Sequence, residues 1–328
     1  MYLGIDLGGT KTAIGLVENN GLIKQRHSFP SIANDFEEYY ESLENQIELF
    51  FNKHKLNIDQ VKAVGVGCAG QIELSSGTIF HSPNLNWSNA PLGNKLRKTF
   101  VNASVTVDND VRAATLGEYL FGLSSRPTVY INIFLGTGIG SGIIIGDRIL
   151  RGYTNSAGEL GLTSIDFSGP RHSSGNRGVY EYYGSGTALE RYGRELAQSQ
   201  LEENPRQLGG NRICDKTESI EAITGKYVGD LAADGNTDAI MLVKKVAQYI
   251  GAGMANVINF LNPQVITYGG GLAEVGPILT DTILETVKER AISTAYEKTD
   301  ILKANLGNDA GIIGAAFLHR VNESGEIS

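Results

Sequence analysis

Cysteine, proline and tryptophan are scarce in this chain, whose 328 residues include 2 cysteines, 8 prolines and 1 tryptophan. Two cysteines as far apart as Cys68 and Cys214 favour a reducing cytoplasm over a single disulfide. Glycine, in contrast, is abundant at 41 residues. With so little proline beside them, the glycines are expected to mark turns rather than disorder.

The chain also lacks an excess of positive charge and any long apolar run. Its net charge of −8 argues against a general nucleic-acid-binding protein. No apolar run of membrane-spanning length and no signal peptide is found, since residues 1–6 already have the pattern of a strand. We therefore expect a cytoplasmic protein without nucleic-acid or membrane partners. Its length favours about two domains.

The apolar pattern predicts two α/β halves built on one plan. The first half is predicted to contain strands at 2–8, 12–18, 22–29, 61–68 and 104–108 and helices near 36–54, 92–99 and 111–121. Residues 69–92 are expected to form a loop and 122–127 a linker. The second half is predicted to contain strands at 128–135, 141–146, 149–152 and 264–268, a polar stretch at 164–186, and helices within 186–260, at about 276–291 and after 309. This repeated plan predicts one lobe from 1–122 with a returning helix at about 310–328, and a second lobe from 123–309.

Two glycine-rich turns, one in each half, carry the strongest indication of function. They are residues 6–12, Asp-Leu-Gly-Gly-Thr-Lys-Thr, and residues 135–142, Leu-Gly-Thr-Gly-Ile-Gly-Ser-Gly, each between two predicted strands. Glycine lets backbone N–H groups approach an anion closely. Their spacing fits neither a dinucleotide-binding fingerprint nor a Walker loop. The pair suggests a polyphosphate held between two lobes; the alternative is that both are simple hairpin turns.

Polar residues at the predicted junction of strand and helix near residue 108 are the second indication. Ligands of α/β folds gather at the carboxyl ends of strands. A helix N-terminus there would keep Asp110 ionised, and its carboxylate could accept the proton of a hydroxyl that attacks phosphorus. The alternative is an ordinary helix cap. Carboxylates and amides that could hold sugar hydroxyls are found at Glu159, Glu181, Asn84 and Asn109, although isolated glutamates are usually solvated.

In this order, the motifs of the chain resemble those of the ROK family of sugar kinases and repressors, within the actin/hexokinase-like superfamily. The matching segments run through the whole chain: 6–12, 67–72, 82–85 with Trp87, 108–110, 135–140, 155–159, 269–271 and 309–316. The resemblance implies an α/β, two-lobed, ribonuclease H-like fold with the active site in the cleft between the lobes. It also implies a homodimer.

The resemblance further implies a role for individual residues. Asp110 would be the catalytic base, and Asp6 would orient ATP-bound Mg²⁺ through water. The sugar would be bound by Gly70, Asn84, Asn109, Asp110, Glu159 and Glu181. The phosphates would lie against Gly8, Gly9, Thr10, Lys11, Thr12, Gly136, Thr137 and Gly138, and the adenosine near Gly270 and Gly271.

The chain departs from the family pattern at a structural zinc site. Many members bind zinc through a histidine after Glu-x-Gly and three cysteines in C-x-C-G-x-x-G-C. Here the histidine position is Leu162, and the cysteine stretch has Ser174 and Val179 at ligand positions. His172 alone cannot form a tetrahedral site, so we expect no structural zinc. Without zinc, the 164–186 segment would depend on hydrogen bonds and on packing of Tyr180, Tyr182 and Tyr183, and sugar would order it.

We therefore expect an ATP-dependent hexose kinase, with conversion of glucose to glucose 6-phosphate as the leading activity. A kinase for N-acetylmannosamine or N-acetylglucosamine is the first alternative, and residues 69–92 and 162–181 would decide it. A sugar-responsive repressor is less favoured because the family's repressors carry a helix-turn-helix domain before this fold. The motifs leave ATP or polyphosphate open as the phosphoryl donor.

Overall fold

The computed structural model describes residues 1–203, 212–217 and 219–328. The part of the predicted helical stretch that falls at 204–211 lies outside the described residues. Two compact units make up the chain: residues 1–132, 142–158 and 304–328 form the first, and residues 133–141 and 159–303 form the second. From the sequence, the first lobe was predicted to span 1–122 and about 310–328. These boundaries stay a prediction.

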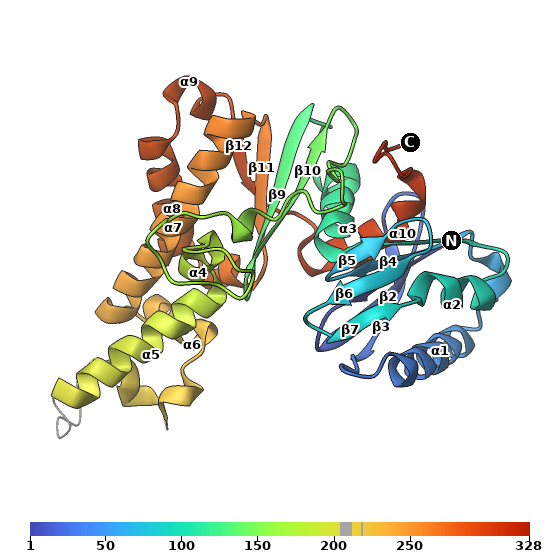
Figure 1. The fold of residues 1–328 in the computed structure, drawn as a ribbon, viewed down its shortest axis with the longest axis horizontal. Helices are drawn as coiled ribbons and strands as arrows, with labels where there is room; N and C mark the ends of the chain where they lie inside the picture. The colour runs from blue at the N-terminus through green and yellow to red at the C-terminus, as the bar shows by residue number, and fades with distance from the viewer. Residues whose placement is uncertain (204–211, 218) are drawn as a thin grey trace. The chain divides into compact units, whose positions relative to one another are not determined.

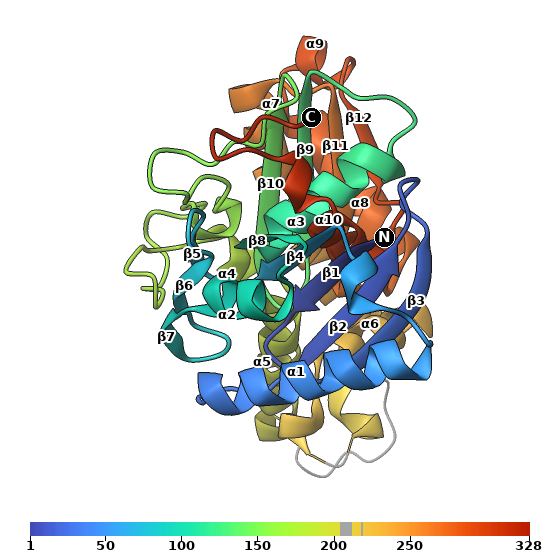
Figure 2. The same ribbon diagram turned by 90° about the vertical axis from the view of Figure 1, so that its right-hand side faces the viewer.

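A five-stranded sheet forms the centre of the first unit, in the order β3-β2-β1-β4-β8 (Figures 1 and 2). Its strands are β1 (Tyr2–Leu7), β2 (Lys11–Val17), β3 (Ile23–Pro30), β4 (Ala63–Cys68) and β8 (Ser104–Asn109). β1, β2 and β3 form an antiparallel meander, whereas β4 and β8 run parallel to β1. Because β4 and β8 are parallel neighbours, their carboxyl ends meet at one edge of the sheet.

Helices pack on both faces of this sheet. The helices of the first unit are α1 (Phe36–Lys53), α2 (Leu92–Thr99), α3 (Asp110–Gly117) and α10 (Ala310–Ala316). Apolar residues of α1 join the core with Leu3 and Ile5, while Gly4, between them on β1, faces α10. A Cβ at Gly4 would lie 1.9 Å from the carbonyl oxygen of Ile312, so only glycine permits this approach. Figure 2 shows α1 running along β1, β2 and β3.

Residues 69–92 differ from the prediction of a loop. They form a small antiparallel sheet of β5 (Gln71–Glu73), β6 (Thr78–Ser82) and β7 (Trp87–Ala90). Turn-forming residues dominate the segment, but Ile79, Leu85 and Trp87 are buried in the hydrophobic core that they share with the main sheet and α1. The strands are short, and the turns between them hide the alternating pattern on which a strand prediction depends.

Two further predictions of secondary structure near the site are corrected. The helix predicted to 121 ends as an α-helix at Gly117 and continues as a π-turn at Glu118–Gly122, where the Glu118 carboxylate accepts the N–H groups of Asn305 and Leu306. The strand predicted at 149–152 is absent there. Only Ile149 forms an isolated bridge, because the chain then closes into a loop.

The second unit combines a sheet with a helical layer. The four-stranded sheet has the order β10-β9-β11-β12, with strands β9 (Val129–Leu135), β10 (Ile139–Ile145), β11 (Val265–Gly269) and β12 (Asp300–Lys303). The division into units falls within this sheet, since residues 129–132 of β9 and 142–145 of β10 count with the first unit. The helices are α4 (Tyr180–Gly184), α5 (Gly186–Glu203), α6 (Gly225–Ala233), α7 (Thr237–Leu261), α8 (Pro277–Arg290) and α9 (Ser293–Tyr296). None of the described helices is long and apolar enough to span a membrane.

Candidate active site

Asp110 is the first residue of α3, directly after β8 ends. The helix is capped by the preceding residue, since Asn109 Oδ1 accepts the N–H groups of Val111 at 3.0 Å and Arg112 at 3.2 Å. The interpretation of this pair as a helix cap is therefore right for Asn109. Asp110 needs no cap role of its own, and its carboxylate accepts the N–H of Val111 at 2.9 Å. No ion pair of Asp110 occurs among the described residues.

Burial raises the pKa of Asp110 above the usual aspartate range, against the opposing effects of the Val111 N–H group and the Arg112 charge. The sequence predicted that the helix N-terminus would keep this group ionised, which requires a lowered pKa. The pKa is raised instead, because removal from water outweighs the effect of the helix. Burial also raises the pKa of Asp6, to about 6, helped by the charge of Asp110 and opposed by Lys11. The two carboxylates thus influence each other in the first unit, and both hold a proton more readily than an exposed aspartate.

Two glycines pack closely against these two aspartates. A Cβ at Gly67, on β4, would lie 3.2 Å from the Cα of Asp110, and a Cβ at Gly311 would lie 2.6 Å from Asp6 Oδ2. A side chain at Gly311 would clash with Asp6, and one at Gly67 would press against α3. Gly67 and Gly311 both fall in the family-like segments, although the sequence assigned a role to neither.

The first glycine turn is the hairpin between β1 and β2. The N–H of Gly8 donates to the carbonyl of Lys11 at 3.0 Å, and Ser31 Oγ donates to the carbonyl of Gly8 at 2.8 Å. Thr10 and Lys11 are exposed, whereas the Thr12 side chain is buried and its hydroxyl bonds Ser31 at 2.8 Å and Tyr39 at 3.1 Å. This placement favours a supporting role for Thr12 over the predicted phosphate contact.

The predicted sugar-binding residues Asn84 and Gly70 also lie in the first unit. Asn84 is exposed and packs against the first glycine turn, since a Cβ at Gly9 would lie 3.1 Å from the Cβ of Asn84. Gly70 has a φ of 137°, and a Cβ there would lie 2.3 Å from the carbonyl oxygen of His81. The structure therefore brings the 82–85 motif next to the 6–12 motif, as a site formed by both requires.

The second glycine turn lies in the second unit and packs against Glu181. The N–H of Gly136 donates to the carbonyl of Gly138 at 3.0 Å, which makes this turn, like the first, a hairpin turn in its backbone geometry. Glu181 Oε2 accepts the N–H of Ile139 at 3.1 Å, and a Cβ at Gly138 would lie 2.4 Å from that oxygen. Thr137 follows in the same turn, and its carbonyl accepts the N–H of Thr187 at 3.3 Å.

Two glycines that the sequence did not single out support this turn. The N–H of Gly186, at the start of α5, donates to the carbonyl of Gly136 at 2.8 Å, and a Cβ at Gly225 would lie 2.7 Å from the carbonyl oxygen of Gly186. Gly270 has a φ of 98° and approaches the carbonyl of Leu135, whereas nothing lies within 4 Å of a Cβ at Gly271. The predicted phosphate and adenosine residues of this unit are thus neighbours. Isolated glycines within helix-like sequence gave no signal that would have marked Gly186 or Gly225.

Glu159 is exposed and precedes the short 3₁₀ helix Leu160–Leu162. Beyond it, the 164–186 segment is held by hydrogen bonds of the kind that the sequence predicted. Tyr180 donates its N–H to the carbonyl of Thr163 and its hydroxyl to that of Ile250, and the Tyr183 hydroxyl donates to Asp166. Whether sugar orders the segment stays a prediction.

His172 contacts Glu181, a role that the sequence did not suggest. His172 Nδ1 accepts the N–H of Ser174 at 3.2 Å, so in the neutral ring Nε2 carries the hydrogen. This Nε2 lies 3.5 Å from Glu181 Oε1. The described residues contain no group of three or more His, Cys, Asp or Glu side chains able to hold a metal ion. The absence of structural zinc stays a prediction.

Elemental analysis tests that prediction. Because the ligand positions carry Leu162, Ser174 and Val179, purified protein should contain far less than stoichiometric zinc. Chelator treatment followed by Mg²⁺ should leave Tm unchanged. His172→Ala serves as the matched control and should show the same zinc content. Stoichiometric zinc that is lost in this variant would contradict the prediction.

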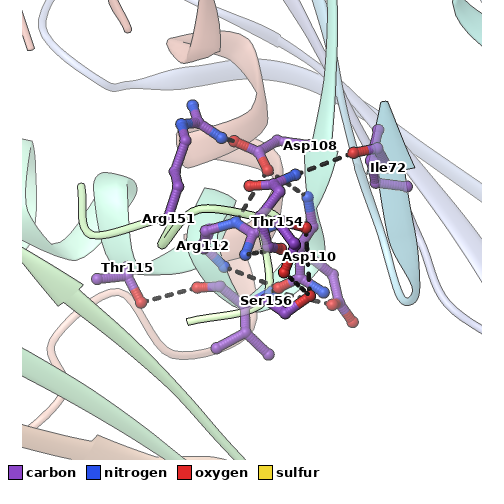
Figure 3. Close-up of polar contacts among 11 residues, drawn as sticks. Ile72, Asp108, Asp110, Arg112, Thr115, Arg151, Thr154 and Ser156 are labelled. Atoms are coloured by element: carbon purple, nitrogen blue, oxygen red, sulfur yellow. Dashed lines mark hydrogen bonds and ion pairs between the residues drawn. The ribbon is translucent and has the colours of Figure 1, made fainter. Parts of the chain in front are cut away.

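Three charged side chains beside Asp110 were also missed. Asp108, Arg112 and Arg151 are buried, and the Asp108 carboxylate is paired with both arginines (Figure 3). Asp108 lies in a family-like motif, but nothing in the sequence linked it to an arginine 43 residues later.

The chain has the fold of the two-lobed actin/hexokinase-like sugar kinases. Solved ROK kinases share this fold. The chain matches the ROK family over residues 2–321 and belongs to that family. The predicted family and fold class are confirmed.

Individual relatives carry two kinds of names. The chain is 33% identical over 321 residues to a glucokinase of Streptomyces coelicolor, covering 98% of both chains. It is 31% identical, with a TM-score of 0.78, to a ROK glucokinase from Streptomyces griseus solved in complex with glucose and AMPPNP, covering 97% of this chain and 98% of that one. It is also 30% identical to a xylose repressor of Caldicellulosiruptor bescii, covering 95% of this chain and 76% of the repressor. The glucokinases support the predicted ATP-dependent sugar kinase.

Proposed function

We propose that this protein transfers the γ-phosphoryl group of ATP to the primary hydroxyl of a hexose, with glucose as the leading substrate. The observation that carries the proposal is Asp110, a carboxylate at the start of α3 with a raised pKa and no ion-pair partner among the described residues. A general base works best with a pKa raised toward the working pH, and the raised pKa of Asp110 supports this role. The ROK glucokinase bound to glucose and AMPPNP supports this choice of substrate and donor.

Asp110 would accept the proton of the sugar hydroxyl as its oxygen forms a bond to the γ-phosphorus. The bond between that phosphorus and the β–γ bridging oxygen breaks at the same time, and ADP leaves. The sugar would be held by the backbone at Gly70 and by the side chains of Asn84, Asn109, Glu159 and Glu181. Asn109 already uses Oδ1 as the cap of α3, so its Nδ2 is the group left to donate.

Each glycine turn would hold phosphate oxygens through backbone N–H groups. Gly8, Gly9, Thr10 and Lys11 would do so in the first unit, with Thr12 supporting the turn from inside. Gly136, Thr137 and Gly138 would do so in the second, with Gly270 and Gly271 beside the adenosine.

The residue that would bind Mg²⁺, through water, is Asp6. A carboxylate oxygen is the ligand that this hard cation prefers, and with a pKa of about 6 the group is mostly ionised at neutral pH. When bound, Mg²⁺ neutralises phosphate charge. We also propose a cytoplasmic homodimer, which size-exclusion chromatography with light scattering tests.

Two other activities remain candidates. Leu162 is half-buried and apolar where the family's histidine would stand near the sugar, which favours testing N-acetylhexosamines. The xylose repressor of Caldicellulosiruptor bescii favours testing a regulatory role.

A coupled assay that follows ADP release decides among these. It would compare glucose, N-acetylglucosamine, N-acetylmannosamine and xylose, each with ATP·Mg²⁺, and polyphosphate would replace ATP in a parallel series. We expect turnover with glucose at a kcat/KM in the usual enzyme range of about 10⁴–10⁸ M⁻¹s⁻¹. Faster turnover of an N-acetylhexosamine would change the substrate. Binding of sugar without turnover would favour the regulator.

A further inference from the structure

Asp108, Arg112 and Arg151 form a buried charged group beside the catalytic helix, and the proposed function uses none of them. Asp108 is fully buried near the end of β8, Arg112 is 3% exposed in the first turn of α3, and Arg151 is 7% exposed at the start of a loop. Arginine and aspartate are rarely this buried unless they are paired. We call these three residues the charged triad.

One carboxylate joins three elements of the first unit. Asp108 Oδ1 accepts the N–H of Asn109 at 2.8 Å and Arg112 Nε at 3.0 Å, and Asp108 Oδ2 accepts Arg151 Nη1. Arg112 Nη1 in turn donates to the carbonyl of Asn155 at 3.1 Å. In Figure 3 the guanidinium groups of both arginines point toward Asp108 from different segments. The triad therefore connects β8, the first turn of α3 and residues 151–158.

The 151–158 loop is closed on itself and anchored at its centre. The N–H of Ala157 donates to the carbonyl of Arg151 at 3.0 Å, and Asn155 Nδ2 donates to the carbonyl of Ile72 at 3.0 Å. Asn155 has a φ of 58°, in the left-handed region that asparagine tolerates better than most residues. Along the chain this loop leads directly into Glu159, while Arg112 follows Asp110 by two positions. The triad thus joins the helix turn that carries Asp110 to the loop that precedes Glu159 along the chain.

Stability alone does not account for this arrangement. A buried ion pair adds little over well-packed apolar side chains of similar volume, whereas removing one partner leaves a buried charge unpaired. Here two arginines pair with one carboxylate, and one of them also donates to a backbone carbonyl. These directional contacts fix the orientation of the segments that they join. An arginine fork fixes such directions better than a lysine ammonium does.

We propose that Asp108, Arg112 and Arg151 are positioning residues that hold the first turn of α3 and the 151–158 loop in one arrangement for the kinase reaction. The proposal rests on the proposed function. The two arginines should differ in how well lysine replaces them. Arg112 uses two different atoms of its fork, on Asp108 and on Asn155, which lysine cannot reproduce. Arg151 uses one nitrogen, and its buried Nε has no hydrogen-bond partner among the described residues, so lysine can replace it.

Three variants test this difference: Arg112→Lys, Arg151→Lys and Arg151→Met. A misplacement of about 1 Å can cost about 10²-fold in rate, so Arg112→Lys and Arg151→Met should lose about that factor in kcat/KM for the sugar, with a higher KM. Arg151→Lys should stay within a few-fold of wild type. Hydrogen exchange at the amides of residues 152–157 should become faster in the first and third variants only. Arg148→Lys, at an exposed ion pair with Glu326 in the same unit, is the matched control and should change neither quantity.

The outcomes separate the possible roles. Wild-type kcat/KM in Arg112→Lys, measured below its Tm, would overturn the proposal and leave the triad with a structural role only. Equal losses in Arg151→Lys and Arg151→Met would overturn the unequal roles of the arginines. If Arg112→Lys does not fold, the comparison of the two Arg151 variants decides. Absence of turnover in the wild type would instead refute the proposed function, and hydrogen exchange would still show whether the triad holds the loop.

Discussion

Replacing Asp110 with asparagine should lower kcat by about 10²–10⁴-fold and leave the fold and the affinity for sugar intact, because the amide keeps the shape but cannot accept the proton. The N–H of Val111 would still find an oxygen at this position. Asn109 would still cap α3, so the helix should not fray. Steady-state kinetics with the preferred hexose, together with calorimetric titration of the sugar, measures both effects.

The exposed Asp281 on α8 supplies the matched control, and Asp281→Asn should behave as the wild type does. The wild-type pH profile gives an independent check. Since burial raises the pKa of Asp110, the acid side of the kcat/KM profile should fall at a higher pH than an ordinary aspartate would give. A kcat near that of the wild type in Asp110→Asn would remove Asp110 from the role of base, whatever the sugar.

The position of Asp110 could be predicted because it depends on local sequence. An apolar run followed by Asp-Asn-Asp and then by helix-forming residues marks the end of a strand and the start of a helix, and β8 and α3 meet there. The glycine turns could be predicted for the same reason, since each is a short hairpin between neighbouring strands. The fold class followed from the order of such motifs, which the ROK match confirms.

The charged triad could not be predicted because its contacts are long-range. β9 and β10 separate Arg151 from Asp108 along the chain, and no local sequence pattern indicates that the two residues pair. The missing strand at 149–152 has the same origin, since the apolar residues at 149 and 150 suggest a strand that the loop interrupts. The direction of the Asp110 pKa also depends on burial by distant residues, whereas the helix N-terminus that favoured the opposite shift is local.

Thr12 illustrates a different limit. The 6–12 motif predicts that its polar residues face a phosphate, but alternation along β2 turns Thr12 inward, where Ser31 and Tyr39 bond its hydroxyl. Lys11, one residue earlier, is exposed. A motif therefore locates a site along the chain without deciding which of its side chains reach it.

Replacing Asp6 with asparagine should stabilise the protein while abolishing most of its turnover. Burial raises the pKa of Asp6 from 3.8 to about 6, so ionising this carboxylate costs free energy in the folded state that it does not cost in the unfolded chain. A shift of this size corresponds to a free energy of unfolding lower by about 3 kcal/mol at neutral pH, an upper value because the site is only partly closed to water. Turnover should fall because the amide is a poorer group than a carboxylate for orienting Mg²⁺.

The pH dependence distinguishes this cause of instability from others. The contribution of Asp6 is favourable below its unfolded pKa near 3.8, and it is lost as pH rises through about 6, so wild-type stability should fall by that amount across this interval. In Asp6→Asn that fall should be absent, and the two proteins should converge in stability near pH 4. Denaturant unfolding from pH 4 to 8, with Asp281→Asn as the exposed control, measures the difference. An Asp6→Asn variant less stable than the wild type at pH 7 would contradict this prediction. It would show that attractive contacts of the Asp6 carboxylate outweigh the cost of its burial.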